Sequence, residues 1–501
     1  MTDQGNTNAS IQDARISMRP TAAGNFVLLL GLLIAYATIQ TDLPSLMASR
    51  VARIVGGFLI ASFLVEIQQI GLRRMIRIDA AALAAFYLLT LAEFLITQPA
   101  LDVQVSSSAV ETGLALVILG MAALTIGRSL VPFNPHRKSN SSLPELTQTE
   151  IFAMTILCFI IGHLHMVIAV GFSPIALFRE LTDPRFAQDW ARGQVGSWSA
   201  LLYELNLLTY LIPPAGAMLL SRWKTLPLIW MPVLLAMLAF VFFSGFSQGS
   251  RYVFAVHLIT FSAALLLSMK RLTLNKVILL VTPALTILIA ASFFTLEFRR
   301  IGLREYVSRI LSGTQIENVE RELSVGSNLE FMVDNNLRAI SALSEYFPKR
   351  HDYLGSEVVI HGLVHPIPRA LWPGKPEKLT IMLEEVLGIQ GATIAATFVG
   401  EGYMAGGLFG VIAFGLVLGF FCGAWNRLGE VTGNQTLLLL YVAGFFWATV
   451  AMRSSMWVTV SALPCLALYV YARFVIPILR KPSSDLVLNR KLETDEKRTQ
   501  K

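Results

Sequence analysis

Long apolar segments recur along almost the whole chain, and this recurrence constrains the fold more than any other feature. A helix that crosses the roughly 30 Å hydrocarbon core of a bilayer needs about 20 mostly apolar residues. The 501-residue chain is 54% hydrophobic and 15% charged, a composition typical of a chain whose main solvent is lipid. We therefore expect an all-α polytopic integral membrane protein. Hydropathy predicts about twelve transmembrane helices, centred on residues 22–39, 52–70, 79–97, 109–127, 151–171, 199–220, 226–243, 252–269, 277–295, 402–424, 435–452 and 456–477.

The basic residues predict how these helices are oriented. Short loops rich in lysine and arginine stay on the cytoplasmic side, and the basic loops obey this rule if both termini are cytoplasmic. Membrane orientation then accounts for the net charge of +7, so no nucleic-acid partner is expected. The predicted organisation is a cytoplasmic N-terminus (1–21), helices 1–9 (22–295) with a middle outer loop (172–198), a large outer loop (296–400), helices 10–12 (401–478) and a cytoplasmic tail (479–501).

One part of the large outer loop has the apolar spacing of an amphipathic helix. Val333, Leu337, Ile340, Leu343 and Phe347 recur three or four residues apart. Such a helix can pack into a protein core or lie on the membrane surface. The sequence leaves both arrangements open.

Arginine is concentrated on the predicted outer side, where lysine is scarce. A guanidinium binds phosphate oxygens in a bidentate manner and stays charged when partly desolvated, so it suits a phosphate-bearing ligand. Contact with lipid headgroups explains many single interfacial arginines. Clustering and position select Arg251 after Ser-Gln-Gly-Ser, Arg299 and Arg300 with Arg304 one turn later, and Arg369 in a proline-rich stretch.

Carboxylates in or near the spans form a second set of candidates, because a charge in lipid is costly and usually faces a cavity or a partner. For Glu66 we favour structural pairing with an arginine or with polar backbone groups, and the roles of Glu93 and Glu204 stay open. Glu401 differs, since it lies between glycines where the large outer loop returns to the membrane. Close backbone approach and an exposed carboxylate are both compatible with that setting.

The histidine spacings predict no metal site. His163 and His165 are two residues apart, which places them on different faces of a helix. Prolines follow His365, and neither it nor His361 belongs to an HExxH pattern. Imidazole titrates near neutrality, so His365 suits a general base. P-loop, Rossmann and serine-hydrolase motifs are missing from the sequence, so no nucleotide cofactor is expected.

A series of glycines follows Glu401, most of them three or four residues apart. Small residues at this spacing give a helix a smooth face, and close packing against another helix is the usual reason for them. The series contains Gly402, Gly406, Gly407, Gly410, Gly415, Gly419 and Gly423.

Three stretches together resemble the O-antigen and exopolysaccharide repeat-unit polymerases, the Wzy family. They are Gly249-Ser250-Arg251, the sequence IPRALWPGKP at 367–376, and Gly400-Glu401-Gly402-Tyr403 with its glycine-spaced helix. The predicted layout of about a dozen spans, with a middle outer loop and one dominant late outer loop, is similar to that family over the whole chain. Arg185 followed by ten residues and Gly196 also resembles an Arg-x10-Gly pattern of some polymerases.

The resemblance implies a glycosyltransferase-C-like fold in the bacterial inner membrane, with an active site that faces the periplasm. The implied reaction polymerises oligosaccharide repeat units linked to undecaprenyl pyrophosphate and releases undecaprenyl pyrophosphate. It uses no cofactor and no metal. The implied partners are the lipid-linked glycan donor and acceptor, membrane lipid, a chain-length regulator and a flippase.

In this interpretation, pyrophosphate is the leaving group and an acceptor hydroxyl loses a proton to a base. Glu401 is the first candidate for that base and His365 the second. An O-antigen ligase, which transfers a finished glycan, and a non-enzymatic transporter of lipid-linked oligosaccharides remain as alternatives. Charge stabilisation is expected from Arg251, Arg299, Arg300 and Arg369, and substrate contacts from Arg185, Trp372, Lys375 and Tyr403.

Overall fold

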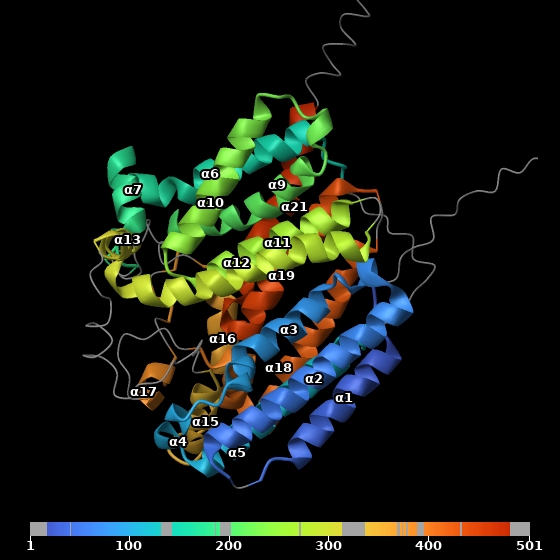
Figure 1. Cartoon of the computed structure of the whole chain (residues 1–501), viewed down its shortest axis with the longest axis vertical. Coiled ribbons are helices and arrows are strands. Elements are labelled where there is room, and N and C mark those ends of the chain that lie inside the picture. Colours follow the sequence, from blue (N-terminus) through green and yellow to red (C-terminus); the bar gives the residue numbers. More distant parts are fainter. Residues whose placement is uncertain are drawn as a thin grey trace, which may run out of the picture.

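The structure is a computed structural model, and its regular elements within the described residues are all helical (Figure 1). This agrees with the predicted all-α class and is compatible with a membrane location. The structure describes residues 18–40, 42–131, 143–185, 187–190, 202–269, 272–312, 336–367, 371–372, 374–376, 379–387, 395–430 and 433–480.

Nine helices among the described residues are long and apolar enough to cross a membrane, and each coincides with a predicted span. They are α2 (Pro44–Ile70), α5 (Ser107–Gly127), α6 (Gln148–Ala169), α10 (Trp230–Ser247), α11 (Arg251–Ser268), α12 (Leu274–Ile301), α18 (Thr397–Gly429), α19 (Gln435–Arg453) and the stretch Ser455–Arg480 with α20 (Val458–Ser461) and α21 (Leu463–Val470).

The other three predicted spans correspond to shorter elements. Two are the apolar helices α1 (Ala22–Ala37) and α3 (Ile78–Thr90). The third is divided between a 3-10 helix (Asn206–Leu211) and α9 (Ile212–Leu220). Proline lacks the N–H that a helix interior needs, so Pro213 and Pro214 fit only the first turn and require α9 to begin there. The count of twelve therefore stays a prediction.

The helices form two groups that α19 connects (Figure 1). In one group, α5 packs against α1, α2, α3 and α18. In the other, α11 packs against α9, α10 and α12, and α6 packs against α9. Because α19 contacts α3 and α18 on one side and α9 and α11 on the other, a feature at either end of α19 can receive side chains from both groups.

Residues predicted on opposite sides of the membrane lie at opposite ends of these helices. At the end of α5, Arg128 contacts Glu66, whereas Ser106 before α5 donates a 2.5 Å hydrogen bond to Glu345. α19 likewise runs between these two ends. Near its beginning, the Tyr441 hydroxyl donates a hydrogen bond to Asn426, and the segment that follows its last residue contacts Glu401. We name these two ends of the bundle the Glu66 end and the Glu401 end.

The amphipathic helix predicted in the large outer loop belongs to the core. It is α15 (Asn336–Tyr346), which packs on α5 and α18. Leu337, Ile340, Leu343 and the following Phe347 are fully buried, whereas Val333 lies outside the described residues. Core packing, one of the two arrangements that the sequence allows, is therefore the one observed.

A sharp turn divides α18, so the glycine series does not form one continuous helix face. Gly407 has φ 61° and ψ −141°, a backbone conformation that a residue with a Cβ adopts only under strain. The two parts of α18 lie so close that a Cβ on Gly402 would meet the Gly410 carbonyl oxygen at 2.9 Å. The early glycines therefore form a tight turn, which corrects the predicted single face. The predicted close helix packing holds for Gly415, Gly419 and Gly423, which lie against α5.

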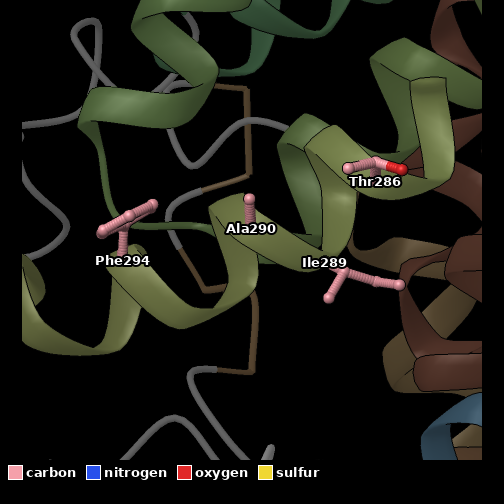
Figure 2. Close-up of a pocket in the computed structure, with 4 residues that line it drawn as sticks. All are labelled: Thr286, Ile289, Ala290 and Phe294. Atoms are coloured by element: carbon pink, nitrogen blue, oxygen red, sulfur yellow. The ribbon is translucent and has the colours of Figure 1, made fainter.

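The first part of α12 is the most exposed of the apolar helices in the described structure. Only 6% of Leu274–Ala291 is buried within the protein, although the segment has no charged residue after Lys276. Thr286, Ile289, Ala290 and Phe294 line an open recess of about 540 Å³ on this helix (Figure 2). A surface this apolar is compatible with contact to lipid chains, and none of the predicted site residues lines it.

Four further helices come from the predicted large outer loop and the middle outer loop. They are α7 (Pro174–Thr182), α13 (Leu303–Leu311), α16 (Ser356–Val364) and α17 (Leu383–Leu387).

Candidate functional site

The end of α19 and the chain that follows it form the centre of the candidate site. α19 ends at Arg453, Ser454 is extended with φ −158° and ψ 119°, and a 3-10 helix then spans Ser455–Trp457. We call residues 449–457 the junction. Two predicted site residues, Glu401 and His365, contact it from distant parts of the chain, and so does Tyr252, the neighbour of Arg251.

Glu401 reaches the junction from the first part of α18. Its carboxylate accepts hydrogen bonds from the hydroxyls of Ser454 and Ser455, and from the backbone N–H groups of Ser455 at 2.6 Å and Met456 at 3.2 Å. The Glu401 side chain is buried, with 3% exposed. A carboxylate that accepts the first N–H groups of a helical turn fixes where that turn begins. The observed role of Glu401 is thus to hold the junction, and a role as a base stays a prediction.

His365 and Lys375 lie on another side of the junction. The His365 ring centroid is 4.5 Å from that of Trp457. The Lys375 ammonium donates to the backbone carbonyls of His365 at 2.6 Å and Ile367 at 3.0 Å. The hydroxyl of Thr459 donates a 2.6 Å hydrogen bond to a backbone carbonyl of α16, the helix that leads to His365. His365 therefore contacts the junction, and Lys375 of the IPRALWPGKP stretch is bonded to the backbone beside it.

His361 precedes His365 by one helical turn, and the two ring centroids are 5.8 Å apart. Partial burial and the positive charge of Lys375 lower the pKa of His361 below its ordinary value, against the opposing effect of Glu357. An imidazole with a lowered pKa is mainly neutral near pH 7. His361 therefore adds little positive charge to this side of the junction.

α11 brings the third predicted motif to the junction. The Ser250 hydroxyl accepts the Val253 N–H at 3.4 Å, so α11 begins at Arg251. The hydroxyls of Tyr252 and Thr449 are 3.2 Å apart. The charged carbon of Arg453 lies 5.6 Å from the centroid of the Tyr252 ring, within cation–π range.

The middle outer loop contributes Arg185 near the same place. Arg185 and Arg453 both lie within electrostatic range of the Tyr210 hydroxyl. The Tyr210 ring stacks on Phe446 of α19 at 3.7 Å between centroids and lies 4.7 Å from His257. Tyr210 is 7% exposed, so this aromatic stack is part of the packed interior beside α19.

Among the described residues, neither Tyr403 nor Trp372 shows a contact with the junction. The Tyr403 hydroxyl donates to the Phe347 carbonyl at 3.3 Å, and its ring contacts Tyr353, so Tyr403 packs in the core behind Glu401. Trp372 is 40% exposed. Arg369 lies outside the described residues, as do the side chains of Arg299 and Arg300. Their predicted roles stay predictions.

The junction carries no motif that marks it in the sequence. Arg453 is one of many arginines on the predicted outer side, and the serines after it belong to no motif. One signal was available: the predicted spans 435–452 and 456–477 leave only three residues between them. So short a link requires an abrupt turn, and polar residues in it need hydrogen-bond partners from elsewhere.

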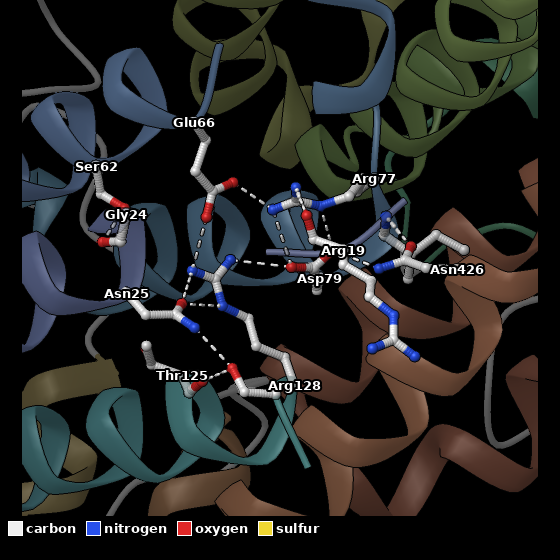
Figure 3. Close-up of polar contacts among 12 residues, drawn as sticks. Arg19, Gly24, Asn25, Ser62, Glu66, Arg77, Asp79, Thr125, Arg128 and Asn426 are labelled. Atoms are coloured by element: carbon white, nitrogen blue, oxygen red, sulfur yellow. Dashed lines mark hydrogen bonds and ion pairs between the residues drawn. The ribbon is translucent and has the colours of Figure 1, made fainter. Parts of the chain in front are cut away.

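A second polar cluster lies at the Glu66 end (Figure 3). Arg77 pairs with Glu66 and, at 3.0 Å, with Asp79. Arg128 pairs with Asp79 at 2.9 Å and Glu66 at 3.2 Å, and all four side chains are at most 1% exposed. The predicted arginine pairing of Glu66 is confirmed.

The cluster balances two guanidinium groups against two carboxylates. Asn25 and Asn426 complete it with hydrogen bonds to Arg128 and Asp79. Buried charges are retained only when paired in this way. Its residues come from α1, α2, α3, α5 and α18 or from the segments next to them, so it ties these helices together far from the junction.

Comparison with known proteins gives a family match but no function. Over residues 195–432 the sequence matches a family described as a domain of unknown function (DUF8712). No curated protein and no solved structure matches the chain. The matched range contains Arg251, His365 and Glu401 and ends before the junction.

Proposed function

We propose that this protein is a glycosyltransferase of the bacterial inner membrane that polymerises undecaprenyl-pyrophosphate-linked repeat units into a surface polysaccharide at the periplasmic face. The observation that carries the proposal is the convergence at the junction. Each of the three stretches that resemble the Wzy family lies at or beside a residue that contacts the junction. Tyr252 directly follows Arg251, His365 lies two residues before the IPRALWPGKP stretch, and Glu401 belongs to the third stretch itself.

The proposed reaction breaks the bond between the anomeric carbon of the growing glycan and the pyrophosphate oxygen. That oxygen keeps the electron pair, and a hydroxyl oxygen of the acceptor repeat unit forms the new glycosidic bond and gives its proton to a base. Arginines near the leaving group stabilise its growing negative charge. Arg251, and the predicted Arg299, Arg300 and Arg369, are the sequence-based candidates for that role.

The contacts at the junction favour His365 over Glu401 as the base. Glu401 is buried, and four donors already occupy its carboxylate. A base must come within hydrogen-bond reach of the proton that it removes. His365 is only partly buried, lies against Trp457, and precedes the IPRALWPGKP stretch by two residues.

Purified protein in lipid nanodiscs, given a lipid-linked repeat unit in the presence of a chelator and without nucleotide, tests the proposal directly. We expect a ladder of longer lipid-linked glycans. His365→Ala should shorten or abolish the ladder, and Arg309→Ala, which changes a partly exposed arginine paired with Glu305, should leave it unchanged.

A deletion in the source organism separates the alternatives. Surface glycan reduced to single repeat units supports polymerisation. Long polymer that accumulates without attachment would instead indicate a ligase, and loss of outward-facing lipid-linked units would indicate a transporter. Either of the last two results, or the lack of a ladder with folded protein, contradicts the proposal.

A further inference from the structure

We infer that α7 and α13 lie side by side on the membrane surface at the Glu401 end, with their apolar side chains immersed among the acyl chains of the phospholipid leaflet. We call residues 172–183 and 303–311, which contain these two helices, the surface pair. The inference does not rest on the proposed function. It assigns a lipid partner to parts of the two predicted outer loops that the proposed reaction does not use.

The exposed face of α13 is apolar. Ile310 and Leu311 follow Val307 by three and four residues, so the three side chains share one face of the helix, and they are 44–82% exposed. A helix that presents large apolar side chains on one face and charges on the others is typical of a helix that lies in the membrane interface. The polar side chains of α13 are those of Arg304, Glu305, Ser308 and Arg309.

α7 presents a similar face from the middle outer loop. Phe172, Ile175 and Phe178 recur every three residues and are 62–84% exposed. On its other side α7 packs on the protein, because Leu181 is buried and the Phe178 ring stacks on Phe243 of α10 at 5.9 Å between centroids. The protein therefore supports α7 from one side, and the side that faces outward is apolar.

The two helices form one unit. Gly302, directly before α13, lies so close to the end of α7 that a Cβ there would meet the Thr182 carbonyl oxygen at 2.8 Å. Arg304 pairs with Asp183 at 3.8 Å. Figure 1 shows α7 and α13 beside each other at the end of α12. The apolar side chains of two separate loops are thus held together, and they can contact one surface at the same time.

The position of α13 after α12 indicates that this surface is lipid. Leu274–Ala291 is only 6% buried within the protein and has no charged residue after Lys276, so lipid chains are its expected surroundings. The end of α12 belongs to the Glu401 end, because Phe298 contacts Phe246, close to the start of α11. Gly302, with φ 85°, then bends the chain into α13. α13 therefore begins where the span leaves the hydrocarbon core, the depth at which amphipathic helices bind.

The charges of the surface pair indicate which property of the lipid matters. Its three arginines are balanced by three carboxylates, so its formal charge is zero. Attraction to anionic headgroups needs an excess of basic residues. Immersion of the apolar side chains, rather than headgroup charge, is therefore the expected source of binding. The charged residues are Arg179, Glu180, Asp183, Arg304, Glu305 and Arg309.

Spin labels on introduced cysteines test the inference in the full-length protein, in phosphatidylcholine nanodiscs that hold one copy each. The three native cysteines are buried, and labelled wild type gives the background. We expect labels in Leu311→Cys and Ile175→Cys to collide mainly with dissolved oxygen, at a depth of about 5–10 Å into the boundary between headgroups and acyl chains. Ser308→Cys is the matched control on an exposed polar face of α13, and its label should collide mainly with a water-soluble nickel chelate. Addition of phosphatidylglycerol should leave these depths unchanged.

A charge on the apolar face of α13 tests whether the two helices act together. Ile310→Glu should move the label of Ile175→Cys towards water, because α7 and α13 are joined at Gly302 and Thr182. Ser308→Glu places the same charge on a polar face and should leave that label where it is.

Labels in Leu311→Cys and Ile175→Cys that meet the nickel chelate as often as the Ser308→Cys label does would overturn the inference. Immersion that appears only with two copies in a nanodisc would overturn it in favour of a contact between copies. Low collision rates with both reagents would show that protein covers the surface pair, and a depth that grows with phosphatidylglycerol would contradict immersion without headgroup attraction. An Ile175→Cys label that ignores Ile310→Glu would overturn the unit of two helices.

Discussion

Replacing Glu401 distinguishes a residue that holds the junction from one that removes a proton. In the structure, one carboxylate oxygen accepts the Ser454 hydroxyl, and the other accepts the Ser455 hydroxyl and the N–H groups of Ser455 and Met456. Glutamine keeps one carbonyl oxygen, which can accept both N–H groups, and its NH2 can donate to the Ser454 hydroxyl. Alanine keeps none of these contacts.

The hydrogen bonds of Glu401 set the expected loss of stability in each of the two variants. Hydroxyls can rotate to other acceptors, but the two backbone N–H groups cannot, and a buried donor left without an acceptor costs about 1–3 kcal/mol. Glu401→Ala should therefore lower the free energy of unfolding by about 2–6 kcal/mol. Glu401→Gln keeps the bonds to the N–H groups, but their acceptor is no longer charged. We therefore expect it to lower the free energy of unfolding by less than about 2 kcal/mol.

Thermal unfolding in detergent, followed by tryptophan fluorescence, measures the loss of stability, and glycan extension measures the loss of reaction rate. A holding role predicts the stability order wild type, Gln, Ala, and a parallel loss of substrate binding and rate in Glu401→Gln. A base contributes about 10²- to 10⁴-fold to a rate without contributing to binding. Glu401→Gln with wild-type stability and binding but a rate lowered to that extent would refute our reasoning and make Glu401 the base.

Three other changes test separate parts of the structure. Arg77→Met leaves the buried Glu66 and Asp79 with one arginine instead of two and should cost about 3–5 kcal/mol, seen as a lower yield of folded protein and a lower unfolding temperature. Gly407→Ala forces a Cβ into a strained turn and should cost about 1–3 kcal/mol in the same assay. The pKa of His361 is lowered in the folded protein, so the unfolded chain takes up a proton first as the pH falls below about 6.5. Wild-type stability should then decrease from neutral pH towards about pH 5 more steeply than that of His361→Gln, and equal slopes would contradict the assigned shift.

Sequence periodicity was sufficient for most of the helices, because each span is long and uniformly apolar. The prediction of helix bounds from periodicity was least accurate where proline or glycine interrupts an apolar run. Pro213 and Pro214 divide one predicted span. Gly406 and Gly407 allow α18 to reverse, and hydropathy cannot register this reversal because glycine is compatible with both a helix and a turn.

The candidate site was harder to predict, since its contacts join residues far apart in the chain. A sequence can show that Glu401 is unusual, but the identity of its partners depends on how α18 and α19 pack. The same limit applied at the Glu66 end, where Arg77 and Arg128 read as orienting charges in loops and are in fact buried partners of carboxylates. Counting charged residues gives the sign of the net charge of a segment, but it does not show which of the side chains are buried.

The turn in α18 explains how the buried carboxylate of Glu401 comes to lie against the junction. If residues 397–429 formed one straight helix, Gly402 and Gly410 would lie about 12 Å apart along its axis. The reversal at Gly407 brings them into contact, so the short first part of α18 packs beside the second, and the Leu354 N–H fixes it through a 2.8 Å hydrogen bond to the Met404 carbonyl. The shape of the junction therefore depends on a turn that only glycine makes without strain. A Gly407→Ala protein that stays folded should extend lipid-linked glycan more slowly than wild type although Glu401 is unchanged, and an unaltered rate would show that the turn and the junction are independent.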